Sequence, residues 1–296
     1  MVTQILHKMN ELHIEASSNC QAKCVMCPRT GLDGLIVTDL TLDWFKENIK
    51  PQDHTKIFFC GILGDPCINK DLNKICRWIK DENPEITLGI NTNGALQNTA
   101  WWEDIASIFT GIYDYVVFSI DGTEKTNHIY REDVSWRKVM ENAKAYINAG
   151  GSAHWDMLVF KHNASEIDEC RKLAKNLGFN WFRSKETIRW DIFPEGINQL
   201  FPVDDSWKDQ EPVDISCESD YSKYYDAQGN KWPCCHMAEA YLLAGNEDIK
   251  KFSNTQLLDN YNERLLNDPY DICKKACGTT SRKGQWRQEI NLTEEK

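Results

Sequence analysis

The sequence predicts an α/β fold built around a parallel sheet, and three observations support this prediction. Short apolar runs alternate with segments of helical period between about residue 11 and residue 187, at the spacing of roughly 30 residues that repeated βα units require. Several runs are rich in β-branched and aromatic residues, which buried parallel strands favour. The chain has 296 residues, enough for one large domain and a small second one. Periodicity alone does not decide between an open doubly wound sheet and a barrel.

Six apolar runs are the expected strands. In chain order they are LHIEAS (12–17), KIFFCGI (56–62), ITLGINT (86–92), YVVFSID (115–121), HWDMLVF (154–160) and FNWFRS (179–184). Helices are expected between them, because apolar residues recur there at spacings of three and four. Two such helical faces consist of Leu72, Ile75, Cys76 and Ile79, and of Trp136, Val139, Met140, Ala143 and Ile147. A third helix is expected to begin with Ser165 as its N-cap and to end just before Gly178.

The pattern changes near residue 190. The stretch FPEGINQLFPVDD (193–205) resembles a linker, and the remainder carries cysteines, a glycine-containing turn and one fairly polar helical segment. No solenoid repeat and no low-complexity tract is visible in the sequence. We therefore expect two domains, one over residues 1–190 and one over residues 191–296.

Charge and hydropathy bear on the partners of the chain. The 45 acidic and 34 basic residues give a formal net charge of -11, which disfavours nucleic acid as a partner. No window approaches the roughly 18 uncharged apolar residues of a membrane helix, and the first 15 residues have polar and acidic breaks where a signal peptide stays apolar. We expect a soluble, cytoplasmic protein with no membrane partner.

The 12 cysteines are the main chemical signal, because without a secretory signal they indicate metal ligands or reduced thiols rather than a disulfide framework. Cys20, Cys24 and Cys27 form a C-x3-C-x2-C triplet just beyond the first expected strand. Three thiolates are one short of the four that a closed zinc site or a fully ligated iron–sulfur cube needs, so one coordination position stays open. The triplet alone also occurs in zinc modules.

Segments at the ends of the next three strands make the triplet more specific. They are GILGDPCINKDL (61–72), NTNG (91–94) and SIDG (119–122). Together with the triplet they resemble the radical S-adenosylmethionine (SAM) enzymes over nearly the whole chain. The resemblance implies a partial (β/α)6 barrel, in which Cys20, Cys24 and Cys27 hold a [4Fe–4S] cluster whose fourth iron binds SAM.

The same resemblance implies a set of SAM contacts. Gly64 and Asp65 match the segment that receives the methionyl amino group, although Leu63 replaces a usual glycine and Asp65 a usual glutamate. The other implied contacts are Asn93 and Ser119 for the ribose or methionyl part, Arg131 for the methionyl carboxylate, and Met26 near adenine.

A second set of cysteines lies late in the chain. Cys217 and Cys234 belong to a C-x11-G-x4-C string that resembles the start of SPASM and twitch domains, and Cys273 and Cys277 complete four ligands. The implied fold is a small twitch-like C-terminal domain with one auxiliary [4Fe–4S] cluster. Cys235 is the rival of Cys234, with spacing favouring Cys234, and a structural zinc site has the same ligand count.

The remaining reactive residues have ordinary alternatives. Cys60, Cys67, Cys76 and Cys170 are expected in the core, where a thiol behaves as a small hydrophobe. Asp121 either approaches the substrate or belongs to a turn. The histidines are expected at the surface or hydrogen-bonded in the interior.

The resemblance implies reductive cleavage of SAM to a 5′-deoxyadenosyl radical, removal of a hydrogen atom from the substrate, and oxidation of the substrate radical through the auxiliary cluster. An external one-electron reductant of the flavodoxin or ferredoxin type is then required. Only a short segment precedes the first strand, so no amino-terminal peptide-recognition domain is expected, and dehydrogenation of a small molecule is favoured. One alternative is a peptide- or protein-modifying maturase. Another is a non-catalytic iron–sulfur or zinc-binding protein.

Overall fold

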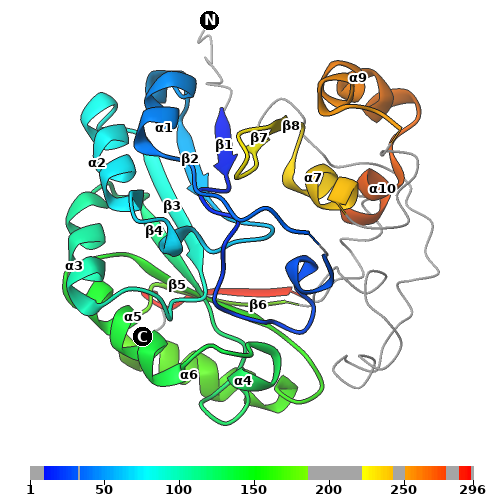
Figure 1. Ribbon diagram of the computed structural model, residues 1–296. Coiled ribbons are helices and arrows are strands. Elements are labelled where there is room, and N and C mark those ends of the chain that lie inside the picture. The colour runs from blue at the N-terminus through cyan, green and yellow to red at the C-terminus, as the bar shows by residue number, and fades with distance from the viewer. Residues whose placement is uncertain (1–9, 33, 186–221, 243–250, 278–286, 295–296) are drawn as a thin grey trace, which may run out of the picture.

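The computed structural model describes residues 10–32, 34–185, 222–242, 251–277 and 287–294 (Figure 1). All six expected strands are present, and the bounds that the structure gives are β1 (Glu11–Ile14), β2 (Lys56–Phe59), β3 (Thr87–Thr92), β4 (Tyr115–Ser119), β5 (Ala153–Leu158) and β6 (Trp181–Lys185). Adjacent members of this series pair in parallel. The predicted α/β fold with a parallel sheet is therefore confirmed.

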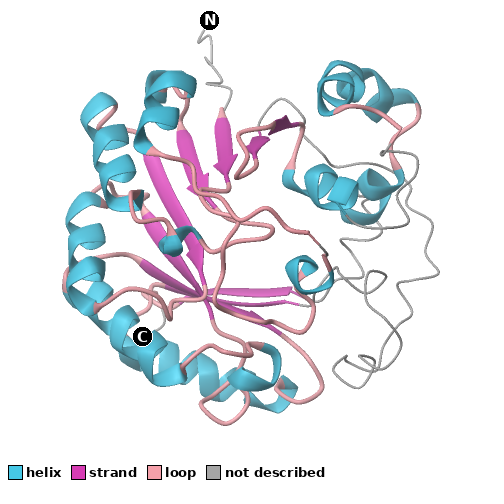
Figure 2. Cartoon of the chain, viewed as in Figure 1, coloured by secondary structure: helices cyan, strands magenta, loops and turns pink. Residues whose placement is uncertain are grey.

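The helices that connect these strands cover the outer face of the sheet (Figures 1 and 2). They are α1 (Leu42–Asn48), α2 (Leu72–Glu82), α3 (Thr99–Ile108), α4 (Asn127–Tyr130), α5 (Trp136–Asn148) and α6 (Ile167–Leu177). Short 3-10 turns lie at η1 (Pro28–Gly31), η2 (Pro51–Asp53), η3 (Pro66–Ile68) and η4 (Ala164–Glu166). On α2, the four apolar residues predicted to share a face are the buried ones. The expected N-cap of α6 is wrong, because Ser165 lies inside η4 and Glu166 takes the cap position. Gly178 ends that helix in the left-handed conformation, as expected.

The inner face of the sheet carries a row of aromatic rings. Successive contacts join His13, Phe58, Tyr115, His154 and Trp181 across the strands, with centroid separations of 4.8–6.3 Å. Gly89 on β3 makes room for this row, since a Cβ there would lie 2.6 Å from the Phe58 ring and 3.0 Å from the Tyr115 ring. The rings fill the middle of the barrel and leave its carboxyl-terminal mouth to polar side chains.

The C-terminal region joins the same sheet at both edges. β7 (Ser222–Tyr225) pairs in parallel with β1 and antiparallel with β8 (Lys231–Trp232), and β9 (Arg287–Asn291) pairs antiparallel with β6. The strand order within the described residues is β8-β7-β1-β2-β3-β4-β5-β6-β9. The predicted domain boundary at residues 190 and 191 lies outside the described residues and stays a prediction.

Three helices of the C-terminal region pack into a second apolar cluster beside the barrel (Figure 1). They are α7 (Cys235–Leu242), α9 (Asn254–Asn267) and α10 (Asp271–Cys277). This cluster also contains Ile62 and Leu63, which belong to the segment after β2. The C-terminal region therefore contacts the barrel through a loop as well as through strand pairing. In the residues that the structure describes, no helix combines the length and apolar character needed to cross a membrane.

Candidate active site at the mouth of the barrel

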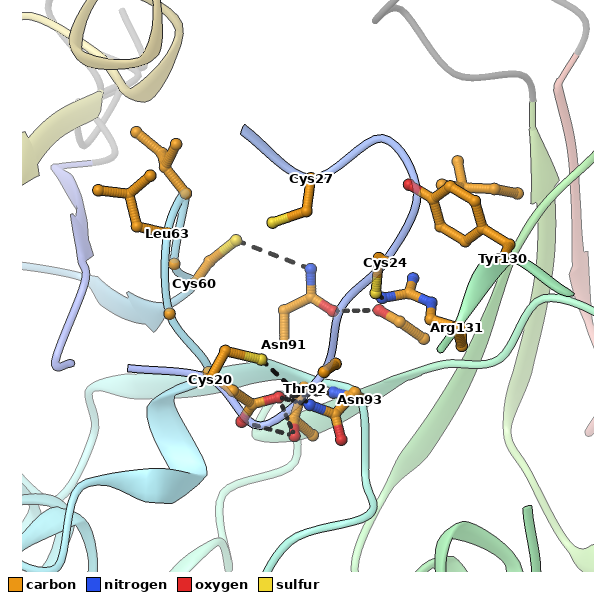
Figure 3. Close-up of a pocket in the computed structure, with 17 residues that line it drawn as sticks. Cys20, Cys24, Cys27, Cys60, Leu63, Asn91, Thr92, Asn93, Tyr130 and Arg131 are labelled. Atoms are coloured by element: carbon orange, nitrogen blue, oxygen red, sulfur yellow. Dashed lines mark hydrogen bonds between the residues drawn. The ribbon is translucent and has the colours of Figure 1, made fainter. Parts of the chain in front are cut away.

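A pocket of about 660 Å³, part of it open to solvent, lies at the carboxyl ends of the parallel strands (Figure 3). Parallel sheets collect ligand-binding residues at this edge because every strand ends there. Of the residues predicted from the sequence, the pocket brings together Cys20, Cys24, Cys27, Gly64, Asp65, Asn93, Ser119 and Arg131. Met26 is not among the lining residues and is fully buried in the barrel core. Its position beside adenine stays a prediction.

The loop that carries the three cysteines is held by backbone contacts. The Cys27 N–H donates to the Cys24 carbonyl at 3.0 Å, and the Val25 N–H donates to the Tyr130 carbonyl at 3.2 Å. The Arg29 guanidinium donates to the Cys20 carbonyl at 2.9 Å. These bonds turn the loop so that the three cysteines lie around one space (Figure 3).

The donor set of this loop is three cysteine thiols around one pocket, and thiolates are the ligands that iron–sulfur clusters use. Three ligands are one short of a closed four-thiolate site. Burial raises the pKa of the Cys20 thiol to about 12, and Asp65 adds to this shift. The bare Cys20 thiol is therefore protonated at neutral pH, and a metal displaces this proton when it binds.

Asp65 lines the pocket, and its buried carboxylate accepts hydrogen bonds from two strand ends. Its carboxylate accepts hydrogen bonds from the Thr92 hydroxyl at 2.9 Å, from the Asn93 N–H at 2.8 Å and from the Asn93 amide at 2.7 Å. It also accepts the Cys67 N–H at 3.0 Å, which caps η3. Burial raises the pKa of Asp65, and the backbone N–H donors oppose that shift. The carboxylate thus ties the end of β2 to the end of β3.

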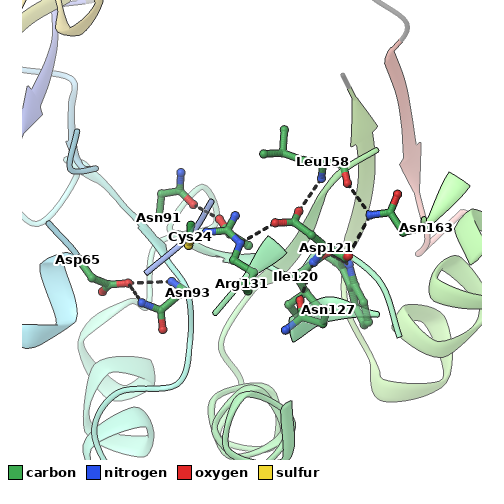
Figure 4. Close-up of polar contacts among 12 residues, drawn as sticks. Cys24, Asp65, Asn91, Asn93, Ile120, Asp121, Asn127, Arg131, Leu158 and Asn163 are labelled. Atoms are coloured by element: carbon green, nitrogen blue, oxygen red, sulfur yellow. Dashed lines mark hydrogen bonds and ion pairs between the residues drawn. The ribbon is translucent and has the colours of Figure 1, made fainter. Parts of the chain in front are cut away.

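Asn93 extends this network to the cysteine loop. Its amide lies 3.8 Å from the Cys20 sulfur and accepts a 2.8 Å hydrogen bond from the Gln21 amide. Asn93 thus links the buried Asp65 carboxylate to Cys20, and Figure 4 shows its contact with Asp65.

Arg131 enters the pocket from the opposite side. Its Nε donates to the Asp121 carboxylate at 2.5 Å, and its Nη1 lies 3.8 Å from the Cys24 sulfur (Figure 4). Asp121 is completely buried and also accepts the Leu158 N–H at 2.6 Å. The sequence left Asp121 open between a substrate contact and a turn residue. The structure gives it a third role, since its carboxylate orients Arg131.

A hydrogen-bonded chain crosses the floor of the pocket. The Ser119 hydroxyl donates to the Asn91 amide oxygen at 2.9 Å, and the Asn91 amide donates to the Cys60 sulfur at 3.7 Å (Figure 3). The prediction that Cys60 belongs to the core is wrong, because Cys60 follows β2 on the inner face and lines the pocket. The other three cysteines of that group, Cys67, Cys76 and Cys170, are fully buried as expected.

Sequence reasoning missed Glu15, a buried carboxylate at the end of β1. Its Oε1 accepts the Leu63 N–H at 2.6 Å and the Gly64 N–H at 3.0 Å, and its Oε2 accepts the Tyr224 hydroxyl at 3.1 Å. The sequence signal is an acidic residue within the expected strand LHIEAS (12–17), and it does not identify the partners of Glu15. Glu15 holds the pocket loop 61–64 and the C-terminal strand β7 at the same carboxylate.

The late cysteines lie near one another in the second apolar cluster. Cys234, Cys235 and Cys273 all contribute to it, and Cys277 lies one turn beyond Cys273 on α10, which packs against α7. The Met237 N–H donates to the Cys234 sulfur at 3.4 Å. Cys217 lies outside the described residues, so its part in this group stays a prediction.

Known proteins share both the sequence pattern and the fold. A sequence model of the radical SAM superfamily matches residues 14–174. The tungsten-containing aldehyde ferredoxin oxidoreductase cofactor-modifying protein of Pyrococcus furiosus is 25% identical over 216 residues. That match covers 69% of this chain and 58% of the relative, so the chain spans less than two thirds of the relative's length.

Solved structures agree with this fold at low sequence identity. Streptococcus suis SuiB bound to S-adenosylmethionine superposes with a TM-score of 0.60 and 16% identity, covering 89% of this chain and 67% of SuiB. Native anSMEcpe with bound AdoMet and the Kp18Cys peptide gives a TM-score of 0.62 at 14% identity, covering 92% of this chain and 90% of anSMEcpe. The superfamily match covers more than half of the chain. The chain therefore belongs to the radical SAM superfamily, whose members are enzymes that bind S-adenosylmethionine and a [4Fe–4S] cluster.

Proposed function

We propose that this radical SAM enzyme oxidises its substrate with the help of one auxiliary [4Fe–4S] cluster in a twitch-like C-terminal region. A small molecule that loses two hydrogens is the favoured substrate. The observation that carries the proposal is the convergence of three cysteines, Asn93 and Arg131 on one pocket at the strand ends. In this proposal Cys20, Cys24 and Cys27 each bind one iron.

When bound at this site, the cluster and SAM would supply a 5′-deoxyadenosyl radical that removes a hydrogen atom from the substrate. The residues of this chain bind and orient the reactants. Arg131, held by Asp121, presents its positive charge beside Cys24, which suits a carboxylate ligand. Gly64 and Asp65 also line the pocket, and in this proposal their segment receives the methionyl amino group. Asn93 and Ser119 offer hydrogen bonds to hydroxyl groups.

In this proposal, apolar side chains around the pocket exclude water. Ile62, Leu63 and Leu158 line it together with the ring of Tyr130. An apolar wall limits the access of water on that side of the pocket, which protects a reactive intermediate from side reactions and strengthens the electrostatic contacts there. Three of these residues come from segments that the second apolar cluster or the Asp121 network already holds in place.

The proposed auxiliary site consists of Cys217, Cys234, Cys273 and Cys277. A fully ligated cluster there would accept one electron from the substrate radical. With the hydrogen atom already removed and one proton lost to solvent, the substrate would then be oxidised by two electrons. The contact between the Met237 N–H and the Cys234 sulfur supports Cys234 over Cys235, because a donor at a helix N-terminus stabilises a thiolate. An external reductant of the flavodoxin or ferredoxin type would deliver the electron to the first cluster.

Modification of a peptide is the second candidate function. Two neighbours of the same fold were solved with peptides, namely SuiB with its precursor peptide SuiA and anSMEcpe with the Kp18Cys peptide. The relative from Pyrococcus furiosus is named as a cofactor-modifying protein, which supports a small molecule instead. These likenesses of 14–25% identity favour neither substrate strongly enough to replace the first candidate.

Anaerobic purification followed by iron and sulfide counts tests the proposal. We expect about eight irons per chain, and 5′-deoxyadenosine after dithionite and SAM are added. About four irons with continued SAM cleavage would contradict the auxiliary cluster, as would zinc in the C-terminal region. Cleavage that a flavodoxin or ferredoxin supports in place of dithionite would establish the class of reductant.

A further inference from the structure

The loop 61–64 is held by two parts of the chain that are far apart in sequence. Glu15, at the end of β1, accepts two backbone N–H groups of the loop on its Oε1. Tyr224, on β7 in the C-terminal region, donates its hydroxyl to Oε2 of the same carboxylate at 3.1 Å. Both side chains are buried, with exposed fractions of 1% for Glu15 and 0% for Tyr224. The hydrogen bonds of Glu15 therefore link the C-terminal region to the pocket wall.

The backbone of the loop has little freedom to take another position. A Cβ on Gly64 would lie 1.9 Å from the Ser17 carbonyl oxygen, and a Cβ on Gly61 would lie 2.1 Å from the Gly64 oxygen. The Asp65 N–H also donates to the Asn19 carbonyl at 2.8 Å, next to Cys20. A shift of the loop would thus move the backbone beside the first cysteine as well.

A side chain of the loop also contacts the C-terminal region. Leu63 stands where the segment that it resembles in radical SAM enzymes usually has a glycine. Its side chain is 4% exposed and packs in the cluster of Tyr224, Trp232 and Met237. An apolar side chain at this position gives the loop an anchor in the C-terminal region, where a glycine would have none. The loop is therefore held by a carboxylate on one side and by apolar packing on the other.

Removal of the tyrosine hydroxyl would leave Oε2 of Glu15 without this donor. Burial raises the pKa of Glu15, whereas the Leu63 N–H, the Gly64 N–H and the Tyr224 hydroxyl oppose that shift. A buried carboxylate that loses a donor satisfies its oxygens by moving or by taking up a proton. Either response changes how firmly the carboxylate holds the Leu63 and Gly64 N–H groups.

We propose that Glu15 and Tyr224 are positioning residues for SAM, and that their hydrogen bond makes SAM affinity depend on the docked C-terminal region. Neither side chain touches the cofactor in this proposal. Glu15 sets the geometry of loop 61–64, and Tyr224 sets the geometry of Glu15. The inference rests on the proposed function in one respect, that this loop contacts the methionyl group of SAM.

Tyr224→Phe is the decisive variant, because it removes only the hydroxyl and keeps the ring in the apolar cluster. The affinity for SAM is measured anaerobically on reconstituted protein, by calorimetry and by the change that SAM causes in the spectrum of the reduced cluster. We expect Tyr224→Phe to raise the Kd for SAM about fivefold, because it removes one of the three donors to the Glu15 carboxylate, and Glu15→Gln to raise it tenfold or more, because it removes the charge that all three donors share. Iron content and Tm should stay close to wild type in Tyr224→Phe.

Tyr225→Phe is the matched control. Tyr225 is the next residue of β7, faces the other side of the strand and contacts the Trp44 ring. It should leave the Kd unchanged. A double variant tests the path of the coupling: when Glu15 is already Gln, Tyr224→Phe should add less than twofold.

The outcomes separate this inference from the proposed function. Wild-type protein that does not bind SAM would contradict the proposed function itself. Wild-type binding with an unchanged Kd in Tyr224→Phe would overturn only the positioning role. Independent, additive effects of the two substitutions would overturn it as well, since the residues would then act separately. If Glu15→Gln does not fold, the comparison of Tyr224→Phe with Tyr225→Phe still decides.

Discussion

The two cysteine-bearing regions differ in what surrounds their thiols. At the barrel mouth, Cys20, Cys24 and Cys27 share a partly open pocket with polar side chains from three strand ends. In the C-terminal region, Cys234 and Cys273 lie among aromatic and aliphatic side chains of the second apolar cluster. Open space beside polar groups suits a site that binds a ligand. Apolar surroundings suit a metal centre that is fully ligated by the protein, because they influence its reduction potential. The contrast supports one catalytic and one auxiliary site.

The two regions are nevertheless parts of one sheet. β7 and β9 of the C-terminal region extend the sheet at opposite edges, and Glu15 joins β7 to the pocket loop. A change in one region can therefore reach the other through strand pairing and through a single carboxylate. The following substitutions test how separate the two sites are.

The largest effect is expected at the open site. Cys24→Ala should abolish 5′-deoxyadenosine formation, because a cluster with two protein ligands is not held in place. Iron content should fall by about half, and the C-terminal site should keep its share. Cys76→Ala is the control, since Cys76 is fully buried on α2 and away from the pocket. It should lower the free energy of unfolding by about 1 kcal/mol and leave cleavage intact. Loss of all iron in Cys24→Ala would contradict the separation of the two sites.

A smaller effect is expected at the closed site. Cys234→Ala should also lower iron by about half, but SAM cleavage should continue because the first site is intact. Product formation should fall more than cleavage does. Cys235→Ala, one residue along, should keep nearly all iron if the helix N-terminus favours Cys234 as the ligand. Equal iron loss in the two variants would contradict that choice of ligand and would be seen directly in the iron and sulfide counts.

The sequence was sufficient to predict the six parallel strands because each is a local apolar run and helical segments separate these runs along the chain. It did not predict β7 or β9. SKYY and RQEIN are short and partly polar, and they become strands by pairing with β1 and β6 about 100 to 210 residues away. Edge strands of this kind depend on a partner that local periodicity does not reveal.

The candidate site shows the same division between local and distant information. The cysteine triplet was visible from its spacing, the other site residues were implied by the family resemblance of the strand-end motifs, and the pocket contains all but one of the residues named in this way. What the sequence could not show is how the carboxylates are used. Asp65 and Asp121 carry motif positions, yet their oxygens serve Asn93 and Arg131. Glu15 was missed because its partners lie 48 to 209 residues away.

Asp65→Asn tests the side of the loop that belongs to the barrel alone. The new amide keeps one acceptor oxygen, so its NH2 group would face either the Cys67 N–H or the Asn93 N–H, which now reach different carboxylate oxygens. The free energy of unfolding should fall by about 2 to 3 kcal/mol, and the Kd for SAM should rise about tenfold. Asp71→Asn is the control, because Asp71 makes only a surface ion pair with Lys74, and it should change stability by less than about 0.5 kcal/mol. Wild-type affinity in Asp65→Asn would show that the C-terminal side alone positions the loop.

The smallest effect concerns pH and tests whether the two regions unfold together. Burial lowers the pKa of His154 to about 4, below the 6.5 of an exposed histidine. Above pH 6.5 the imidazole is neutral in both states, but below it the unfolded chain takes up the proton first, so stability is lost as the pH falls from 6.5 toward 4. Between pH 7.5 and 5.5 this residue should cost about 1 kcal/mol in urea unfolding.

His154→Phe keeps a ring against Tyr115, which stacks on His154 at 4.8 Å, and should remove that share of the pH dependence. Amide hydrogen exchange of β7 then decides the comparison. Because β7 pairs with β1 of the barrel, its protection should weaken with acid to the same extent as that of β4 and β5, and His154→Phe should restore both. If the substitution leaves the protection of β7 unchanged, the C-terminal region unfolds as its own unit. Tyr224 would then be a contact between independently unfolding regions and not part of one cooperative sheet.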